Sequence, residues 1–315
     1  MRFKPQTTVV PALTGREGAA TAALMTAPRP IAGLSDLAGA YDALLCDVWG
    51  VIHNGRESFA AACRALARFR AERGPVILIS NSPRPHGPVI EQLDGLGVPR
   101  EAWSRIVTSG DATRVLLAER APGPAWKVGP DRDDALYAGL GVQFSDLEHA
   151  GFISVTGPYD DEADEPGDYR DRFRAAVARD LELICANPDI VVQRGDRLIY
   201  CGGALAQLYE SLGGRVTMAG KPYPAIYELS LAKAAEARSA AGERPLDPRR
   251  VLCIGDGLPT DVRGANARGL DVLFVASGIH GAETLGPDGL NAAAVADLLH
   301  QAGLSANYAI ADLVW

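Results

Sequence analysis

The length and composition of the sequence indicate a folded protein with room for two domains. It has 315 residues, of which 47% are hydrophobic and 22% are charged, as is typical of packed globular proteins and not of disordered ones. The formal net charge of −8 argues against general binding to nucleic acid or to anionic lipid, because both depend on a basic surface. A phosphorylated small molecule would therefore need a local cationic site.

The cysteines and the hydropathy pattern exclude other classes. The five cysteines are widely separated and form no CxxC pair, so we expect buried thiols and no zinc site. The sequence has no run of about 18 apolar residues and no charged-then-apolar leader. We expect a cytoplasmic protein with no membrane partner, whose first 30 or so residues form a partly irregular lead-in.

Short apolar runs alternate with amphipathic segments along the chain. In chain order, residues 43–47 predict a strand, residues 57–74 a helix and residues 75–80 a second strand. Four further strands are predicted at 152–157, 183–189, 250–256 and 271–278, and two further helices at 224–237 and 259–270. This alternation predicts a doubly wound α/β fold with parallel sheets.

Three of the predicted strands end in polar residues. Asp47, Ser80 and Asp256 follow the first, second and fifth of these strands. In an open parallel sheet the carboxyl ends of the strands line the ligand crevice, near the point where the strand order reverses. We therefore expect the functional site at these strand ends.

Asp47 has the chemistry of a nucleophile. It ends a buried strand in the segment LLCDVWGVIHNG, and Gly50 follows in a turn. A carboxylate can attack phosphorus and form an aspartyl phosphate that water later cleaves. Taken alone, the segment is explained equally well by an aspartate that caps a turn or the next helix.

Ser80, Asn81 and Lys221 are candidate phosphate-binding residues. Backbone N–H groups of a turn after a strand can hold phosphate oxygens, although Ser80 alone also fits an ordinary turn serine. Lys221 stands between a glycine and a proline, just before a predicted helix whose N-terminus favours anions. Its ammonium would offset the charges of a carboxylate and a phosphate, but a solvated lysine is the alternative.

Asp256 and Asp261 are candidate metal ligands. They lie in the segment VLCIGDGLPTDVRGA, on a loop between a buried strand and a helix. Magnesium prefers oxygen ligands, typically one or two carboxylates together with substrate phosphate and water. Asp261 alternatively only starts the helix.

The order of these four segments resembles the haloacid dehalogenase superfamily. Asp47, Ser80, Lys221 and the loop from Asp256 to Asp261 fall on its four motifs, so the resemblance covers nearly the whole chain. The long insertion between the second and third motifs resembles class IIA members, such as NagD-type sugar and nucleotide phosphatases and pyridoxal phosphate phosphatases. The segments TSGDATRVLL, CANPD and GGALAQLYESLGGRVTMAGKPYP also resemble that group.

The resemblance implies a fold and an activity. The expected fold is a Rossmann-like core with a parallel sheet, from residues 1–111 and 218–315, and an α/β cap from residues 112–217. The expected activity is Mg²⁺-dependent hydrolysis of a small phosphorylated metabolite, a sugar, nucleotide or cofactor phosphate. Many class IIA members pair through their caps, so a homodimer is also expected.

The resemblance also implies residue roles. Asp47 would attack phosphorus, Ser80 and Asn81 would hold the phosphoryl oxygens, and Lys221 would neutralise charge. The remaining roles concern the metal and the cap. Mg²⁺ would be held by Asp47, the carbonyl of Trp49 and Asp256, with support from Asp261. The cap near the cleft would be shaped by Asn187 and Asp189. Residues 157–169 of the cap are either a segment that contacts the substrate or a solvated acidic loop.

Trp49 departs from the family pattern. The residue two positions after the nucleophile is usually an aspartate that protonates the leaving oxygen and then activates water. Loss of such a group typically removes on the order of 10²–10⁴ in rate. Either the substrate has a good leaving group, or another residue such as His53 substitutes, or the protein binds a phosphorylated ligand without turnover.

A dehalogenase is a further alternative. Haloacid dehalogenases carry an aromatic residue at the position of Trp49. They need no metal and have a helical cap inserted elsewhere, so Asp256, Asp261 and the class IIA insertion favour phosphate and magnesium.

Overall fold

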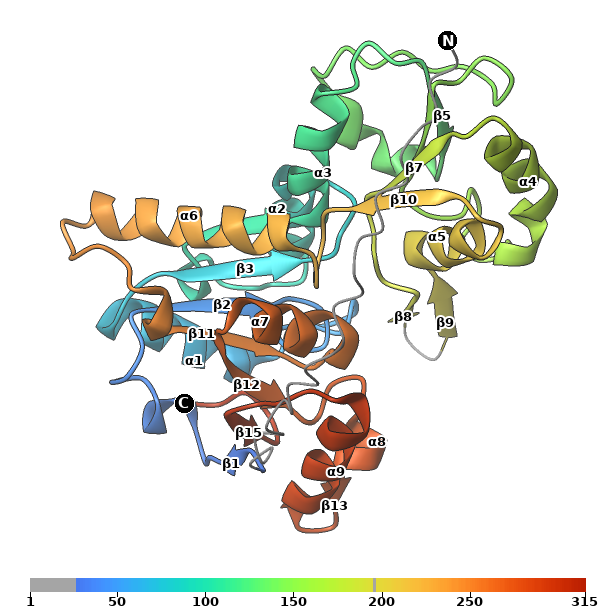
Figure 1. The fold of residues 1–315 in the computed structure, drawn as a ribbon. Coiled ribbons are helices and arrows are strands. Elements are labelled where there is room, and N and C mark those ends of the chain that lie inside the picture. Colours follow the sequence, from blue (N-terminus) through green and yellow to red (C-terminus); the bar gives the residue numbers. More distant parts are fainter. Residues whose placement is uncertain (1–26, 195–196) are drawn as a thin grey trace, which may run out of the picture.

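A computed structural model of the protein describes residues 27–194 and 197–315. These residues form a seven-stranded sheet of order β1-β15-β12-β11-β2-β3-β4 and a four-stranded sheet of order β10-β7-β6-β5, in which all neighbouring strands are parallel. The smaller sheet lies beyond one end of the larger one (Figure 1). The α/β class with a large parallel sheet is therefore confirmed.

The strands of the seven-stranded sheet carry the predicted motifs at their carboxyl ends. They are β1 (Arg29–Pro30), β2 (Ala43–Asp47), β3 (Val76–Ser80), β4 (Arg105–Thr108), β11 (Val251–Gly255), β12 (Asp271–Val275) and β15 (Tyr308–Ile310). The helices that connect or cover them are α1 (Ala60–Glu72), α2 (His86–Gly95), α3 (Ser109–Ala118), α6 (Pro224–Ala240), α7 (Arg263–Arg268), α8 (Gly281–Thr284) and α9 (Ala292–Ala302).

Alternate side chains of the central strand β2 face two different hydrophobic cores. Leu44 and Cys46 pack in a core with buried residues of α1 and α2, whereas Ala43 and Leu45 pack in a core with α6, α7 and α9. This follows from the two-residue repeat of a strand, which points successive side chains to opposite faces. Helices therefore cover both faces of the sheet and leave its strand ends for the site.

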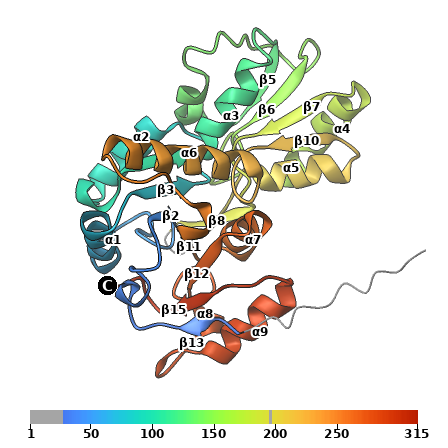
Figure 2. The same cartoon turned by 60° about the vertical axis from the view of Figure 1, so that its left-hand side comes forward.

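The four-stranded sheet is also covered on both faces. It consists of β5 (Ala125–Val128), β6 (Phe152–Val155), β7 (Glu182–Cys185) and β10 (Arg215–Met218). One face packs with α4 (Arg170–Ala178) and α5 (Gly202–Ser211), and the other includes Leu117 of α3. Figure 2 shows α4 and α5 on the side of this sheet away from α3.

The strand order places the functional crevice between β2 and β11. The chain runs from β2 through β3 to β4 at one edge, builds the smaller sheet, and returns to β11 on the other side of β2. Connections on the two sides of such a switch point diverge and leave a crevice at the carboxyl ends. Asp47 ends β2 and Asp256 directly follows β11.

The six predicted strands correspond to β2, β3, β6, β7, β11 and β12. Of the strands in these two sheets, β1, β4, β5, β10 and β15 were not predicted. They are short, and β4, β5 and β10 carry polar residues such as Arg105, Lys127 and Thr217. The helix predicted at 259–270 begins as a π-helical turn at Leu258–Val262 and continues as α7.

Other expectations have mixed outcomes. All five cysteines are buried free thiols, as predicted. The irregular lead-in falls mostly on residues 1–26, outside the described residues. The division into a core (1–111 and 218–315) and a cap (112–217) stays a prediction. Within residues 27–194 and 197–315, no helix has the length and apolar character needed to span a bilayer.

Candidate active site

A cavity of about 790 Å³ opens at the carboxyl ends of β2, β3 and β11, and residues of both sheets' connections line it. Every residue to which the sequence analysis assigned a role borders this cavity. These residues are Asp47, Trp49, Ser80, Asn81, Asn187, Asp189, Lys221, Asp256 and Asp261. The structure therefore gathers segments that lie up to about two hundred positions apart in the chain.

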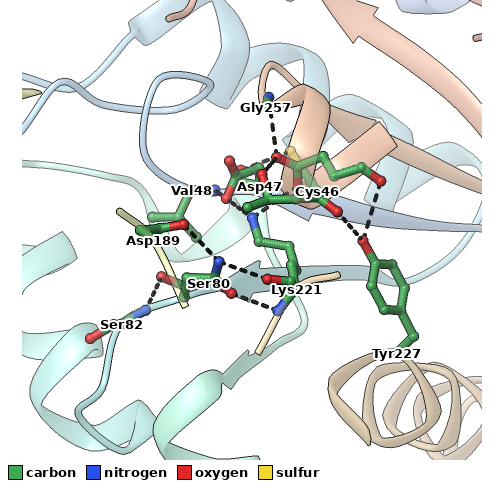
Figure 3. A network of polar contacts seen from close by, with 12 residues as sticks. Cys46, Asp47, Val48, Ser80, Ser82, Asp189, Lys221, Tyr227 and Gly257 are labelled. Carbon is green, nitrogen blue, oxygen red and sulfur yellow. Dashed lines mark hydrogen bonds and ion pairs between the residues drawn. The ribbon is translucent and has the colours of Figure 1, made fainter. Parts of the chain in front are cut away.

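Lys221 is the centre of the site. Its Nζ lies 2.5 Å from Oδ1 of Asp47 and 2.9 Å from Oδ1 of Asp261, and all three side chains are buried (Figure 3). Burial alone would lower the pKa of Lys221, but the carboxylates of Asp261 and Asp47 outweigh it and hold this pKa well above its ordinary value. The lysine is therefore a permanent buried cation.

Asp47 has one carboxylate oxygen engaged and one available. Oδ1 accepts hydrogen bonds from Lys221 Nζ and from the backbone N–H of Val48, the latter at 2.7 Å. Oδ2 has no donor among the described residues. Burial raises the pKa of Asp47 well above its ordinary value, Asp261 raises it further, and Lys221 opposes both. A second cation beside Asp47 would therefore favour its ionised form.

Asp261 is held in place by its own loop. Its Oδ2 accepts from the backbone N–H of Gly257 at 3.3 Å and from Oγ1 of Thr260 at 3.2 Å. The hydroxyl of Tyr227, on α6, lies 3.3 Å from the carbonyl oxygens of Thr260 and Asp261 and donates to them. These contacts, together with the bond to Lys221, use both carboxylate oxygens of Asp261.

The carboxylates form a group that fits a divalent cation. One ligand atom from each of Asp47, Asp256 and Asp261 lies within 4.8 Å of the others. Asp256 Oδ2 accepts from Ile279 N–H at 2.8 Å, and burial, followed by Asp261, raises the pKa of Asp256 to about 6. One ammonium opposes three buried carboxylates, so a hard cation with oxygen ligands would restore the charge balance. Asp47 Oδ2 and Asp256 Oδ1 are the oxygens that no described residue engages.

Asn81 joins the second and third motifs to the smaller sheet. Its Oδ1 accepts from the backbone N–H of Lys221 at 2.7 Å, and its Nδ2 donates to Oδ1 of Asp189 at 2.8 Å and to the carbonyl of Lys221 at 3.2 Å. The side-chain amide is thus fully used. Only the backbone of Asn81 remains for a phosphoryl group, and its side chain has a positioning role that the sequence did not predict.

Ser80 and the loop after β7 border the same cavity. Ser80 Oγ accepts from the backbone N–H of Ser82 at 3.2 Å, which leaves its hydroxyl hydrogen free to donate to a ligand. Asn187 Oδ1 accepts from the backbone N–H of Asp189 at 3.2 Å and stabilises the turn that carries it. Residues 157, 158 and 161 of the acidic segment 157–169 also line the cavity.

Trp49 forms part of the cavity wall. Its ring packs against Gly55, where an added Cβ would lie 2.5 Å from Cη2 of the indole, and it meets the His53 ring edge-on at 5.1 Å between centroids. His53 Nδ1 accepts from the backbone N–H of Gly55 at 2.9 Å, so the proton of the neutral ring is on Nε2. Burial lowers the pKa of His53 to about 4. At pH 7 only about one His53 in a thousand is protonated, so it is poorly suited to replace the missing acid.

Comparison with known proteins identifies the family. The model of the haloacid dehalogenase-like hydrolases matches residues 44–143, and a HAD-hydrolase-like model matches residues 218–302. A solved haloacid dehalogenase-like hydrolase from Brucella suis 1330 is 45% identical, with a TM-score of 0.78 over 91% of this chain and 100% of that chain. The chain belongs to the haloacid dehalogenase-like hydrolases.

Two more distant similarities concern phosphatases. A D-glycerol 3-phosphate phosphatase from Mycobacterium tuberculosis is 27% identical over 258 residues, which cover 79% of this chain and 67% of that protein. A solved glycerol phosphate phosphatase from M. tuberculosis, in complex with calcium, is 25% identical with a TM-score of 0.56, over 77% of this chain and 68% of that chain. The haloacid dehalogenase-like hydrolase described here thus resembles phosphatases over most of its length.

In this haloacid dehalogenase-like hydrolase, two glycines set the position of Asp256. A Cβ added at Gly278, three residues after β12, would overlap Oδ2 of Asp256, and one added at Gly50 would overlap the same oxygen. Gly50 also has a φ of +84°, a conformation that favours glycine. Gly50 was identified from the sequence, but Gly278 was not. Gly278 ends the predicted strand 271–278 at the carboxyl edge of the sheet, and this position could have indicated that it borders the site.

We expect Gly278→Ala to weaken binding of a divalent cation by about tenfold or more, because the new methyl group displaces the Asp256 carboxylate. Titration with Mn²⁺, followed by calorimetry or by the paramagnetism of the ion, measures the change. Gly281→Ala is the matched control, since the nearest atom to its added Cβ lies at 3.7 Å. Unchanged affinity in a folded Gly278→Ala protein would contradict the placement of the ion beside Asp256.

Proposed function

We propose that the protein is a Mg²⁺-dependent phosphatase of small phosphorylated metabolites that works through an aspartyl phosphate on Asp47. The observation that carries this proposal is the buried Asp47–Lys221–Asp261 ion-pair group, beside Asp256, at the switch point of the sheet. A charged group of this kind is costly to bury, and such groups are concentrated at sites of ligand binding and catalysis. The M. tuberculosis relatives, which are phosphatases by name, support the same class.

The residues suit transfer of a phosphoryl group to a carboxylate. Asp47 attacks phosphorus through a carboxylate oxygen as the bond to the leaving oxygen breaks, and the leaving oxygen takes its proton from solvent water. A second water then cleaves the acyl phosphate, which regenerates the Asp47 carboxylate and frees inorganic phosphate. Lys221 offsets the charge between Asp47 and the phosphoryl group, and Ser80 Oγ donates to a phosphoryl oxygen. Mg²⁺, held by Asp47, Asp256 and the carbonyl of Trp49, would neutralise charge on the phosphoryl oxygens.

We assign substrate selection to the loops that connect the strands of the smaller sheet. The segment around Asn187 and Asp189 reaches the catalytic group through Asn81, so it closes one side of the cavity over the substrate. A cavity of about 790 Å³ accepts a metabolite of sugar or nucleotide size. A cytoplasmic location and a homodimer stay predictions.

We expect phosphate release from a panel of phosphorylated metabolites to require both Mg²⁺ and Asp47. Asp47→Asn should abolish release and the acid-stable capture of phosphoenzyme, because it removes the nucleophile. Asp288→Asn, at an exposed position outside the cavity, is the charge-matched control and should retain activity. Ligand binding without any phosphate release would instead identify a phosphoryl-ligand-binding protein, and halide release without metal would identify a dehalogenase.

We expect the turnover rate to fall steeply as the pKa of the leaving group rises. Trp49 supplies no proton, and the low pKa of His53 leaves little imidazolium to replace it, so good leaving groups should react faster. Comparison of kcat for aryl, acyl and alkyl phosphates measures this dependence. Equal rates for the three classes would show that another proton donor operates.

We expect Trp49→Asp to raise kcat for alkyl phosphates by roughly 10²-fold, because it restores an acid beside the leaving oxygen. The matched control is Trp49→Asn, which removes the same indole from Gly55 and His53 but cannot donate a proton as an acid. The rate on aryl phosphates should change little. A folded Trp49→Asp protein that is no faster than Trp49→Asn would assign the tryptophan a positive role in the reaction.

A further inference from the structure

Arg84 is a partly buried cation in the cavity that the phosphatase mechanism does not use. It lies four residues after Ser80, and its Nη2 donates to Oε1 of Gln92, a neutral acceptor, at 2.5 Å. No carboxylate in the described part of the chain forms an ion pair with it. Arg132, which also lines the cavity, is by contrast paired with Asp161.

The charges around Arg84 are mixed. Asp133 and Glu91 favour its cationic form, Arg132 opposes it, and burial lowers its pKa. Arg132 and Asp133 belong to the connection after β5 in the smaller sheet, and both line the cavity. Arg84 is therefore partly desolvated, with nearby carboxylates but without an ion pair among the described residues, and a bound anion would compensate its charge more completely.

The backbone that carries Arg84 is fixed by the neighbouring helix. Arg84 N–H donates to Ser82 Oγ at 3.3 Å, and Gly110 N–H, at the start of α3, donates to the carbonyl of Ser82 at 3.0 Å. A Cβ at Gly110 would lie 2.6 Å from the carbonyl carbon of Arg84, so this contact requires glycine. His86 N–H donates to Asp111 Oδ1 at 3.2 Å and anchors the other side. The guanidinium is thus presented from a preorganised turn.

The spacing sets the size of a suitable ligand. Four residues span at most about 14 Å when fully extended, so the backbone of Arg84 lies within about that distance of Ser80. A guanidinium offers a planar fork that matches a carboxylate or a phosphate with two hydrogen bonds. Ser80 and Arg84 line the same cavity, so this spacing is compatible with a small molecule that carries a phosphate and a second oxyanion.

We propose that Arg84 binds a second anionic group of the substrate, so that the preferred substrates are small phosphate monoesters that also carry a carboxylate or a second phosphate. This inference rests on the proposed phosphatase function. Gln92 holds the guanidinium in place and leaves its remaining N–H groups for the ligand.

The test compares ligands that differ only at the second group. Glycerate 3-phosphate carries a carboxylate, glycerol 1,3-bisphosphate a second phosphate, and glycerol 3-phosphate only a hydroxyl. Binding to the Asp47→Asn protein with Mg²⁺ is measured by calorimetry, and kcat/KM is measured with the wild-type protein. We expect one or both ligands with two anionic groups to be preferred by roughly 10- to 100-fold over glycerol 3-phosphate. The better of the two identifies the second group.

Variants separate Arg84 from general effects. Arg84→Met should remove the preference while leaving the affinity for glycerol 3-phosphate nearly unchanged. Gln92→Glu should reduce the preference with Arg84 still present, because the new carboxylate pairs with the guanidinium, so the test does not depend on the Arg84→Met protein folding. Arg105→Met, at an exposed position outside the cavity, is the matched control and should keep the preference.

The outcomes distinguish this inference from the proposed function. Preferential binding of a ligand with two anionic groups, without turnover, retains the role of Arg84 and contradicts the proposed phosphatase function. Turnover with equal kcat/KM for all three ligands retains the phosphatase and overturns the role of Arg84. Equal losses for all three ligands in Arg84→Met, or no binding of any of them, also overturn it.

Discussion

One buried ammonium group, Nζ of Lys221, holds the site together. It joins Asp47 at the end of β2 to Asp261 on the loop after β11, so it connects the two strands that flank the switch point. Its own backbone is fixed by Asn81 at the end of β3. A charge in this position has no water to replace a lost partner, which makes the relative placement of these three strand ends strongly determined.

The surplus of negative charge around Lys221 is what gives the site its chemistry. Asp256 adds a third carboxylate, held between Gly50 and Gly278 and fixed by the N–H of Ile279. Burial raises the pKa values of Asp47 and Asp256, the neighbouring Asp261 raises them further, and Lys221 opposes these effects. A divalent ion brings positive charge and a phosphoryl group brings negative charge, so each favours binding of the other at this site. Metal binding and substrate binding are therefore coupled.

The same residues tie the catalytic sheet to the smaller sheet. Asn81 contacts Lys221 on one side and Asp189 on the other, so the connection that follows β7 is attached directly to the phosphate-binding motif. Arg84, three residues after Asn81, lies beside a connection of the smaller sheet that carries Arg132 and Asp133. One short segment, residues 80–84, thus contributes both Asn81, which contacts Lys221 and Asp189, and the guanidinium of Arg84 to the cavity.

The sequence alone was sufficient to predict the class of fold and the family, and it singled out the residues that the structure brings together around Lys221. Buried strands such as 43–47 and 251–255 are continuous apolar runs with an aspartate as their last residue or directly after it, and such local patterns are readable without coordinates. The short strands β4, β5, β10 and β15 were missed because neighbouring strands, and not their own composition, stabilise them.

The contacts between individual atoms follow from the tertiary structure and not from the sequence pattern. In the structure the Asn81 side chain hydrogen-bonds to Lys221 and Asp189, and Gly55 fixes the neutral tautomer of His53. Arg84 lies in the cavity and forms no ion pair within residues 27–194 and 197–315. These contacts join residues up to 140 positions apart. Hydrogen-bond partners and burial depend on how separate strands and loops are brought together, and no local pattern of residues contains that information.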